Sequence, residues 1–470
     1  MANAVTKAAK EQNAPAPIVA AGLTRRSVTN GEHSDALPGP IAAEDKRSFF
    51  KRLLRARAGG LDVPHRSAGR NARHAIALAH ALMSERGEVS GARFARDALA
   101  AYQALGPTDS KAFFDLLVKQ FSPDPEVVGR CADKYRNDPS QTNLIILQQA
   151  AEPPRQELFR RLNMASGGTG VLVDMRRRLL QGLAENPQWL GIEADLAHLL
   201  RSWFNRGFLT LQRIDWRSSA LVLEKLINYE AVHQIQGWPD LRRRLQADRR
   251  CYAFFHPALP EEPLIFIEVA LTRGMSAKVQ PLLDPDSPVL DPAFADCAIF
   301  YSITNCQQGL RGVSFGNFLI KQVVEDLGRE LPRLKVFATL SPVPGLRSWL
   351  IAAADASDTG PLHAELSAIL AKLDVSHWFE DKLLSAELQR RLAPLCAYYL
   401  LYAKQEQEPR DPAARFHLVN GARLARLNWL GDTSATGMRQ SAGIMVNYVY
   451  RLAEVERNHE AYARNRIVVA

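Results

Sequence analysis

Apolar residues recur with helical spacing through the first half of the chain. Between Phe113 and Phe121 they stand at i, i+1, i+4, i+5 and i+8, which places them on one face of a helix. Pro123 and Pro125 then end this helix. Similar apolar clusters, separated by Pro and Gly, continue as far as Trp203. The pattern predicts a helical bundle over residues 46–204, without catalytic chemistry of its own.

The pattern changes near Gly207, where short runs of strand length replace the helical spacing. After a short strand candidate at Phe208–Leu211 and a helix from Ser219 to Val232 come three apolar runs of strand composition: Pro263–Leu271, Ala298–Thr304 and Leu334–Leu340. Two helices complete the pattern, one presenting an apolar face from Leu319 to Leu327 and one at Lys382–Lys404. The chain is therefore predicted to be α+β, with a helical bundle followed by a mixed α/β domain over residues 205–470.

The first 45 residues differ from both regions. Pro15, Pro17, Pro38 and Pro40 stand among Ala, Thr and Asn, and no continuous apolar segment of the kind found in a secretory signal is present. Arg25 and Arg26 would suit a transit peptide, whereas nearby acidic residues argue against one. We expect a disordered leader over residues 1–45.

Composition narrows the class of ligand. Lys and Arg total 59 against 50 Asp and Glu, and this net charge of +9 suits a polyanionic ligand such as a nucleotide or coenzyme A, and equally suits solubility alone. No aromatic-interleaved basic stretch or zinc-finger spacing indicates a nucleic-acid partner, and no apolar run reaches the roughly 18–20 residues of a membrane span. The five cysteines form no CxxC pair, which predicts reduced, buried thiols in a cytosol-like compartment and no metal site.

A glycine-rich loop, Gln307–Gly316, joins the second strand-like run to the helix that follows it. Strand, glycine-rich loop and helix form an arrangement that binds pyrophosphate, because backbone N–H groups of the loop and first helical turn point at the anion. Arg311 and Lys321 could add positive charge, and Asn317 is a favoured N-cap residue. The loop lacks the Walker A and Rossmann patterns. A plain connection between strand and helix remains the alternative.

Two known patterns fit this same loop. The segment Arg311–Gly316 resembles the pyrophosphate-binding motif of the GNAT acyltransferases, with Ser314 in place of the middle glycine. The segment Gly312–Gly316 also fits G-x-S-x-G, the nucleophile elbow of α/β-hydrolases, for which His417 could complete a triad. An elbow needs its serine at a sharp turn directly after a strand, and several loop residues intervene here. The hydrolase interpretation is therefore disfavoured.

Several separated segments together resemble malonyl-CoA decarboxylases. They are Phe300–Ile303, Gln307–Leu310 with Gly312–Lys321, Leu340–Gly345, Phe416–Gly421 and Asn447–Tyr450, with further similarity at Tyr229–His233, Trp238 and Arg249–Tyr252. The resemblance is strong over Phe208–Tyr450 and weaker over the helical half. It implies a helical N-terminal domain followed by a GNAT-like catalytic domain.

The resemblance also implies the reaction and the residues that perform it. The reaction is decarboxylation of malonyl-CoA to acetyl-CoA and CO2, without a metal, biotin or other cofactor. His417 is expected to donate a proton to the carbanion, and Ser341 to be its hydrogen-bonding partner and proton acceptor, with Tyr450 as a third member. Coenzyme A is expected to contact the loop residues Arg311, Gly312, Val313, Ser314, Phe315, Gly316 and Asn317. Related animal enzymes often have Glu where this chain has Ser314, and we expect Ser314 only to line the coenzyme A loop.

Each of these residues also has a purely structural interpretation. A serine before Pro-x-Pro often caps a strand end, and an isolated histidine or Tyr450 among apolar neighbours is often a core residue, as we expect for His256. Asn420-Gly421 is a hairpin turn signal whatever His417 does.

Two other functions compete with decarboxylation. A GNAT-type acyltransferase would move an acetyl group from coenzyme A to an amine, and a silent acyl-CoA-binding or scaffold protein would catalyse nothing. The Ser341 and His417 motifs favour the decarboxylase over both. The family resemblance implies a homo-tetramer or homo-dimer formed largely through the helical domain. The C-terminal residues Arg466–Ala470 lack the Ser-Lys-Leu peroxisomal signal, so the expected location is the cytoplasm.

Overall fold

The computed structural model describes residues 69–84, 88–313, 319–356, 361–464 and 466–469. It confirms the predicted fold class, a helical region followed by a region of mixed sheet and helix. The expected leader over residues 1–45 and the loop positions Ser314 to Asn317 lie outside the described residues.

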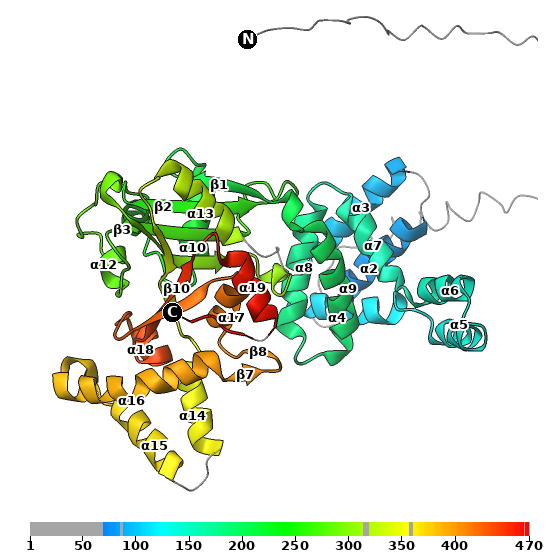
Figure 1. Ribbon diagram of the computed structural model, residues 1–470. Coiled ribbons are helices and arrows are strands. Elements are labelled where there is room, and N and C mark those ends of the chain that lie inside the picture. Colours follow the sequence, from blue (N-terminus) through cyan, green and yellow to red (C-terminus); the bar gives the residue numbers. More distant parts are fainter. Residues whose placement is uncertain (1–68, 85–87, 314–318, 357–360, 465, 470) are drawn as a thin grey trace, which may run out of the picture. The chain divides into compact units, whose positions relative to one another are not determined.

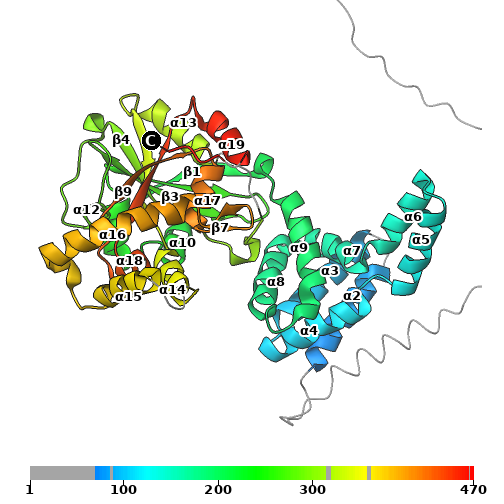
Figure 2. The ribbon, with the colours of Figure 1, turned by 60° about the horizontal axis from the view of Figure 1, so that its bottom comes forward.

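The N-terminal region is built from amphipathic helices (Figure 1). They are α2 (Arg70–Ser84), α3 (Glu88–Gln103), α4 (Pro107–Gln120), α5 (Pro125–Asn137), α6 (Gln141–Ala151), α7 (Pro154–Asn163), α8 (Gly168–Gly182) and α9 (Leu190–Trp203). The helix predicted from Phe113 to Phe121 is confirmed as part of α4, whose Phe113, Phe114 and Leu117 are buried. Figures 1 and 2 show α5 and α6 lying side by side as a helical hairpin.

The second region is organised by one sheet with the strand order β1-β2-β3-β4-β5-β10-β6, in which β9 also pairs with β10. Its strands are β1 (Thr210–Ile214), β2 (Arg249–Phe255), β3 (Ile265–Thr272), β4 (Cys297–Asn305), β5 (Val336–Thr339), β6 (Ser341–Pro342), β9 (Arg423–Asn428) and β10 (Met445–Tyr450). The strands β4 and β5 pair in parallel, and the other pairs are antiparallel. A separate two-stranded ribbon is formed by β7 (Lys404–Gln405) and β8 (Glu408–Pro409).

Helices cover both faces of the sheet. Alternate residues of each strand point to opposite sides, so both faces carry apolar side chains that the helices bury. On one face Phe300, Phe337 and Tyr448 share a core with helices that include α13 (Leu319–Glu330), α14 (Leu346–Ala356), α15 (Pro361–Leu373), α16 (Lys382–Leu401) and α17 (Pro412–Val419). On the other face lie α10 (Ala220–Tyr229), α11 (Trp238–Arg244) and α12 (Gln280–Leu283). The remaining helices are α18 (Ala435–Ser441) and α19 (Val455–Ala463).

The helical region and the sheet share part of one core. Val173 of α8, Leu200 of α9 and Phe204 just after it are buried in the cluster that also contains the sheet residues Phe254 and Ile265. Phe204 has no exposed surface, and its ring centroid lies 4.6 Å from that of His256. His256 is buried, and its ring nitrogens contact the Trp203 carbonyl and the Ala258 N–H, as expected for a satisfied core histidine.

Two local predictions need correction. The strand expected at Phe208–Leu211 begins at Thr210, because Arg206–Phe208 form a 3-10 turn capped by the side chain of Asn205. The hairpin turn expected at Asn420-Gly421 is wrong, since these residues end α17 ahead of β9. Gly421 takes a positive φ of 79°, and the Ala422 N–H donates to the His417 carbonyl, which is a helix C-terminal motif. Within the described ranges, no helix is long and apolar enough to cross a membrane.

Candidate active site

The histidine singled out from the sequence lies on the buried face of a short helix. α17 begins at Pro412, whose missing N–H costs nothing at this position, and the Asp411 side chain accepts the Ala414 N–H at 2.9 Å as its N-cap. His417 stands in the last turn and is 4% exposed. Its ring stacks on Tyr448 of β10 with centroids 4.7 Å apart, so the helix presents the imidazole to the sheet.

Ser341 reaches the same face of the sheet through strand alternation. Phe337 belongs to the core on the α17 side, whereas Ala338 and Leu340 belong to the core on the opposite side. Residues 339 and 341 therefore point toward α17, with the period of two that a strand requires. Ser341 and Thr339 are both buried.

The strand ladder is interrupted beside Ser341. β10 pairs with Phe337 and Ala338 of β5 and again with Ser341 and Pro342 of β6, in one continuous register. Between these pairs side chains complete the hydrogen bonding: the Tyr448 N–H donates to Thr339 Oγ1 at 3.1 Å, and Asn447 Nδ2 donates to the Thr339 carbonyl at 2.6 Å. The sheet is thus opened locally at the position where Ser341 faces the histidine.

The structure brings Ser341, His417 and Tyr450 together. His417 Nε2 lies 2.9 Å from Ser341 Oγ, and His417 Nδ1 lies 2.9 Å from the Tyr450 hydroxyl. The imidazole therefore bridges a serine and a tyrosine, and all three side chains are buried. Residues 76 and 33 positions apart in the sequence converge on one ring.

The hydrogen bonds around this ring support one arrangement of protons. Ser341 Oγ donates to Thr339 Oγ1 at 2.9 Å, which leaves the serine oxygen to accept from His417. A neutral imidazole carries one N–H, so Nε2 holds it and Nδ1 accepts from the Tyr450 hydroxyl. This assignment gives both nitrogens of His417 a partner and directs the ring proton at Ser341.

Burial sets the charge of the site. Desolvation lowers the pKa of His417 to about 3, because the imidazolium loses its hydration there. The same effect raises the pKa of the Tyr450 hydroxyl well above its usual value. At neutral pH both side chains are uncharged, so a negative charge entering the site becomes its dominant electrostatic feature.

Two residues that support the site had no assigned role in the sequence analysis. Thr339 positions both Ser341 and the backbone of Tyr448, and Asn447 holds the Thr339 carbonyl. Asn447 is fixed in turn by Arg426 Nε at 3.0 Å and by Asn428 Nδ2 at 2.9 Å. Asn447 belongs to the motif Asn447–Tyr450 and Thr339 directly precedes the motif Leu340–Gly345, but periodicity alone does not distinguish either residue from an ordinary strand residue.

The described part of the expected coenzyme A loop is a short 3-10 turn, Gln308–Leu310, followed by Arg311, Gly312 and Val313. Gly312 adopts a positive φ of 74°, which glycine allows at no steric cost. The apolar face predicted for the next helix is confirmed in α13, where Leu319, Val323 and Leu327 are buried. Lys321 pairs with Glu456 at 2.9 Å, so it is not a free cation beside the loop.

No side-chain cluster suited to a metal occurs within the described ranges, counting groups of three or more His, Cys, Asp or Glu. Four of the five cysteines are buried free thiols, as predicted, and Cys131 is half-buried. Burial raises the pKa of Cys251 well above its usual value, as expected of an unreactive core thiol.

Family comparisons match most of the chain. Residues 207–470 match the family described as "Malonyl-CoA decarboxylase C-terminal domain", and residues 121–204 match "Malonyl-CoA decarboxylase N-terminal domain". The chain is 39% identical over 343 residues to "Malonyl-CoA decarboxylase, mitochondrial" of Anser anser anser, which covers 68% of each protein. It is 36% identical over 351 residues to the protein of the same name from Rattus norvegicus, covering 69% of this chain and 71% of that one.

Solved structures agree with the sequence comparisons. The chain is similar to the malonyl-CoA decarboxylase of Rhodopseudomonas palustris with a TM-score of 0.82 and 51% identity, covering 85% of this chain and 98% of that one. It is similar to the enzyme of Agrobacterium vitis with a TM-score of 0.79 and 49% identity, covering 84% and 98% of the two chains.

Proposed function

The chain belongs to the malonyl-CoA decarboxylase family, and from that premise we propose that it converts malonyl-CoA to acetyl-CoA and CO2 with Ser341 and His417 as a catalytic dyad. The observation that carries the proposal is the buried imidazole held between Ser341 and Tyr450 by two contacts of 2.9 Å. Such a ring has a defined proton position, which a general acid for a carbanion needs, and its burial keeps competing water away from the site.

The reaction begins when the carboxylate of the malonyl group enters this uncharged site. A carboxylate beside the ring favours the imidazolium, so the pKa of His417 rises from its resting value of about 3 and the ring takes up one proton from solvent. Tyr450 then accepts a hydrogen bond from Nδ1–H and fixes the ring in place. Ser341 can turn its hydroxyl from Thr339 to the carboxylate and orient the bond that will break.

Decarboxylation then breaks the bond between the methylene carbon and the carboxylate. The bonding electrons move into the thioester as an enolate, and CO2 departs. The enolate oxygen needs aimed hydrogen-bond donors while its charge exists. His417 Nε2 delivers its proton to the methylene carbon, which yields acetyl-CoA and returns the ring to its neutral form. One proton is consumed in each turnover, as the overall reaction requires.

Other finer assignments belong with this proposal. We propose that the region over residues 205–470 is GNAT-like, which the local opening of the sheet at Thr339 and Leu340 supports. The segment Arg311 to Asn317 would bind the pyrophosphate and pantetheine of coenzyme A, mainly through backbone amides. The helical region over residues 46–204 would make the contacts of a homo-dimer or homo-tetramer, and the protein would act in the cytoplasm.

The test is formation of acetyl-CoA from malonyl-CoA by the purified protein beside Ser341→Ala and His417→Ala. We expect each substitution to lower kcat by about a hundredfold or more, the scale of a lost general acid. Retained binding of coenzyme A and an unchanged thermal midpoint would show that each variant is folded. Full turnover in both variants would reject the dyad and leave the family assignment intact. A wild type that is silent on malonyl-CoA but acetylates an amine would favour the acyltransferase.

A further inference from the structure

The helix α8 forms hydrogen bonds with the loop that follows β4. Arg176 Nη1 donates to the carbonyls of Gly309 at 2.7 Å and Arg311 at 2.8 Å, and its Nη2 pairs with Glu193 at 2.6 Å. Arg176 is 3% exposed, so these bonds are shielded from water. An arginine of the helical region thus fixes the course of the loop backbone.

The loop also lies in close contact with α8 at Gly309. A Cβ added to Gly309 would stand 1.9 Å from the Val173 carbonyl oxygen, so only glycine fits there. Gly309 therefore allows the loop backbone to approach α8 closely. Together with the hydrogen bonds of Arg176, this contact places α8 directly beside any ligand that the loop binds.

A pocket of about 530 Å³ lies between α8 and this loop. No acidic residue of the described chain lines this pocket. Its polar lining consists of two arginines and four side-chain amides: Arg177, Arg311, Gln181, Asn305, Gln307 and Gln308. Arg177 holds Asp174 through Nε and Nη2, and among the residues described its Nη1 has no hydrogen-bond partner. The volume is in the range of small-ligand sites, and the lining suits an anion with hydrogen-bonding groups.

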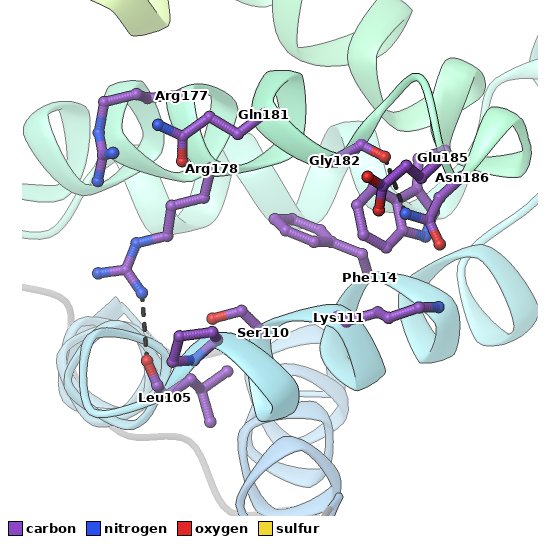
Figure 3. A pocket seen from close by; sticks show the side chains of 12 residues that line it. Leu105, Ser110, Lys111, Phe114, Arg177, Arg178, Gln181, Gly182, Glu185 and Asn186 are labelled. Carbon is purple, nitrogen blue, oxygen red and sulfur yellow. Dashed lines mark hydrogen bonds between the residues drawn. The ribbon is translucent and has the colours of Figure 1, made fainter.

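A pocket on another side of α8 provides a contrast (Figure 3). It has a similar volume, but its cations are neutralised: Lys111 pairs with Asp115 at 3.0 Å, and Arg178 pairs with Asp174 at 2.8 Å. Glu185 also lines it. Figure 3 shows Arg178 reaching across to the Leu105 carbonyl, to which it donates at 3.2 Å. Arg177 and Gln181 line both pockets, and Arg177 is also paired with Asp174. The charge that distinguishes the loop side of α8 is therefore Arg311, which forms no ion pair with the described residues, together with the unused Nη1 of Arg177.

The loop-side pocket is suitably placed for the far end of an extended ligand. β4 and β5 run parallel, with Phe300 beside Thr339, so their carboxyl ends share one edge of the sheet. In this register Ser302 of β4 is level with Ser341. Asn305, which lines the pocket, lies three residues beyond Ser302, or about 10 Å along the strand. The pantetheine arm of coenzyme A is long enough to span such a separation.

We propose that this pocket takes the phosphorylated adenosine end of coenzyme A. Arg177 of α8 contacts a phosphate there, and Arg176 is a positioning residue that holds the loop against the ligand. The inference rests on malonyl-CoA being the substrate, and it gives the helical region a direct part in substrate binding.

The experiment compares malonyl-CoA with malonyl-pantetheine, which lacks the nucleotide. In Arg177→Ala we expect the KM for malonyl-CoA to rise about tenfold with little change in kcat, so that the preference for malonyl-CoA over malonyl-pantetheine falls by the same factor. Arg176→Gln is expected to act in the same direction, and Arg176→Lys, which can still donate to both carbonyls, to restore part of the loss. Arg178→Ala is the matched control on the same helix and should keep the wild-type preference.

Two results would overturn the inference: an unchanged preference in Arg177→Ala, or an equal rise of both KM values. Failure of the proposed function is distinguishable, because the wild type would then not turn over malonyl-CoA at all. In that case calorimetric titration with coenzyme A and with pantetheine tests whether the pocket binds the nucleotide. Nucleotide-dependent binding that is weakened in Arg177→Ala supports the pocket, and binding equal to wild type rejects it.

Discussion

His417 shows how much one residue depends on its surroundings. In water an imidazole takes up a proton near pH 6.5, but burial against Tyr448 and between two hydroxyls lowers the pKa of His417 to about 3. The ring is neutral at rest, and in the proposed mechanism it becomes an acid only beside a negative substrate. The effect of this pKa shift on the free energy of unfolding can be measured without substrate. The contribution of the neighbouring Tyr450 hydroxyl can be measured through kcat.

The first prediction concerns Tyr450. Tyr450→Phe removes the donor to His417 Nδ1 and leaves that nitrogen buried without a partner. We expect kcat to fall about tenfold to a hundredfold, the equivalent of a lost hydrogen bond of roughly 1–3 kcal/mol, with little change in KM. Steady-state kinetics on malonyl-CoA measures this. Tyr448→Phe keeps the ring that stacks on His417 and should retain wild-type kcat, and equal losses in the two variants would contradict the proposed role of the Tyr450 hydroxyl.

The second prediction concerns the pH dependence of stability. The folded pKa of His417 is about 3 and the unfolded value is near 6.5, so the unfolded chain binds more protons between these values. The stability contributed by the neutral ring is complete above pH 6.5 and is lost as the pH falls toward 3. Between pH 7 and pH 5.5, the free energy of unfolding should therefore fall by about 1 kcal/mol more in the wild type than in His417→Asn.

Urea unfolding of both proteins at the two pH values checks this difference. The lowered pKa of His233, about 4, acts with the same sign, and the raised pKa values of Glu268, about 8, and Asp411, about 6, act with the opposite sign. These groups are present in both proteins, so their effects cancel in the comparison. Identical pH dependence in wild type and variant would show that His417 is not buried as a neutral ring.

At the scale of an element, α17 and the interrupted strand β5–β6 bring together the two residues of the proposed dyad. α17 has eight residues, too few to be stable alone, and it depends on its N-cap and on packing. The break in the ladder at Thr339 allows Ser341 to face the helix, and the Asn447 side chain completes the hydrogen bonding of the opened strand. Each element is locally weak and is held by contacts from elsewhere in the chain.

The third prediction tests the cap of α17. Asp411→Ala removes the acceptor of the Ala414 N–H and should destabilise the protein by about 0.5–2 kcal/mol while lowering kcat, because His417 stands on the same helix. Asp411→Asn keeps a capping oxygen and should recover most of both losses. Asp381→Ala is the matched control, since Asp381 caps α16 and should cost stability without a comparable loss of kcat. Unchanged kcat in a folded Asp411→Ala protein would contradict the dependence of the site on this cap.

At the scale of the whole molecule, the helical region and the sheet are joined by a shared core and by Arg176. Val173, Leu200 and Phe204 extend the core of the sheet into the helices, and Arg176 ties α8 to the loop after β4. Two regions that share buried side chains are expected to unfold together.

The fourth prediction follows from this shared core. Calorimetry of the wild type should show one cooperative transition rather than one for each region. Phe204→Ala removes a fully buried ring from the shared core and should cost about 3–5 kcal/mol. Phe208→Ala is the matched control, because Phe208 is 53% exposed and its ring also lies near His256. Two separate transitions in the wild type would show that the regions are energetically independent.

The sequence by itself determined the fold class and the family, and it supplied the side chains that we propose to react. Helical spacing predicted α4 and α13, because periodicity of 3.6 residues reports a buried face whatever the neighbours are. The motifs around Ser341, His417 and Tyr450 could be recognised because they are contiguous in the chain. The strands β9 and β10 gave no comparable signal, and Asn420-Gly421 was misinterpreted because a helix end and a hairpin turn both favour Asn-Gly.

Only the tertiary structure decided how these residues meet and what their chemistry is. The distance from Ser341 Oγ to His417 Nε2, the lowered pKa of His417 and the support from Thr339 and Asn447 all depend on segments far apart in the sequence. The same holds for the pocket beside the loop, to which α8 contributes Arg177 and the loop contributes Arg311. Burial and long-range hydrogen bonding are properties of the packed chain, so no local pattern of residues could have predicted them.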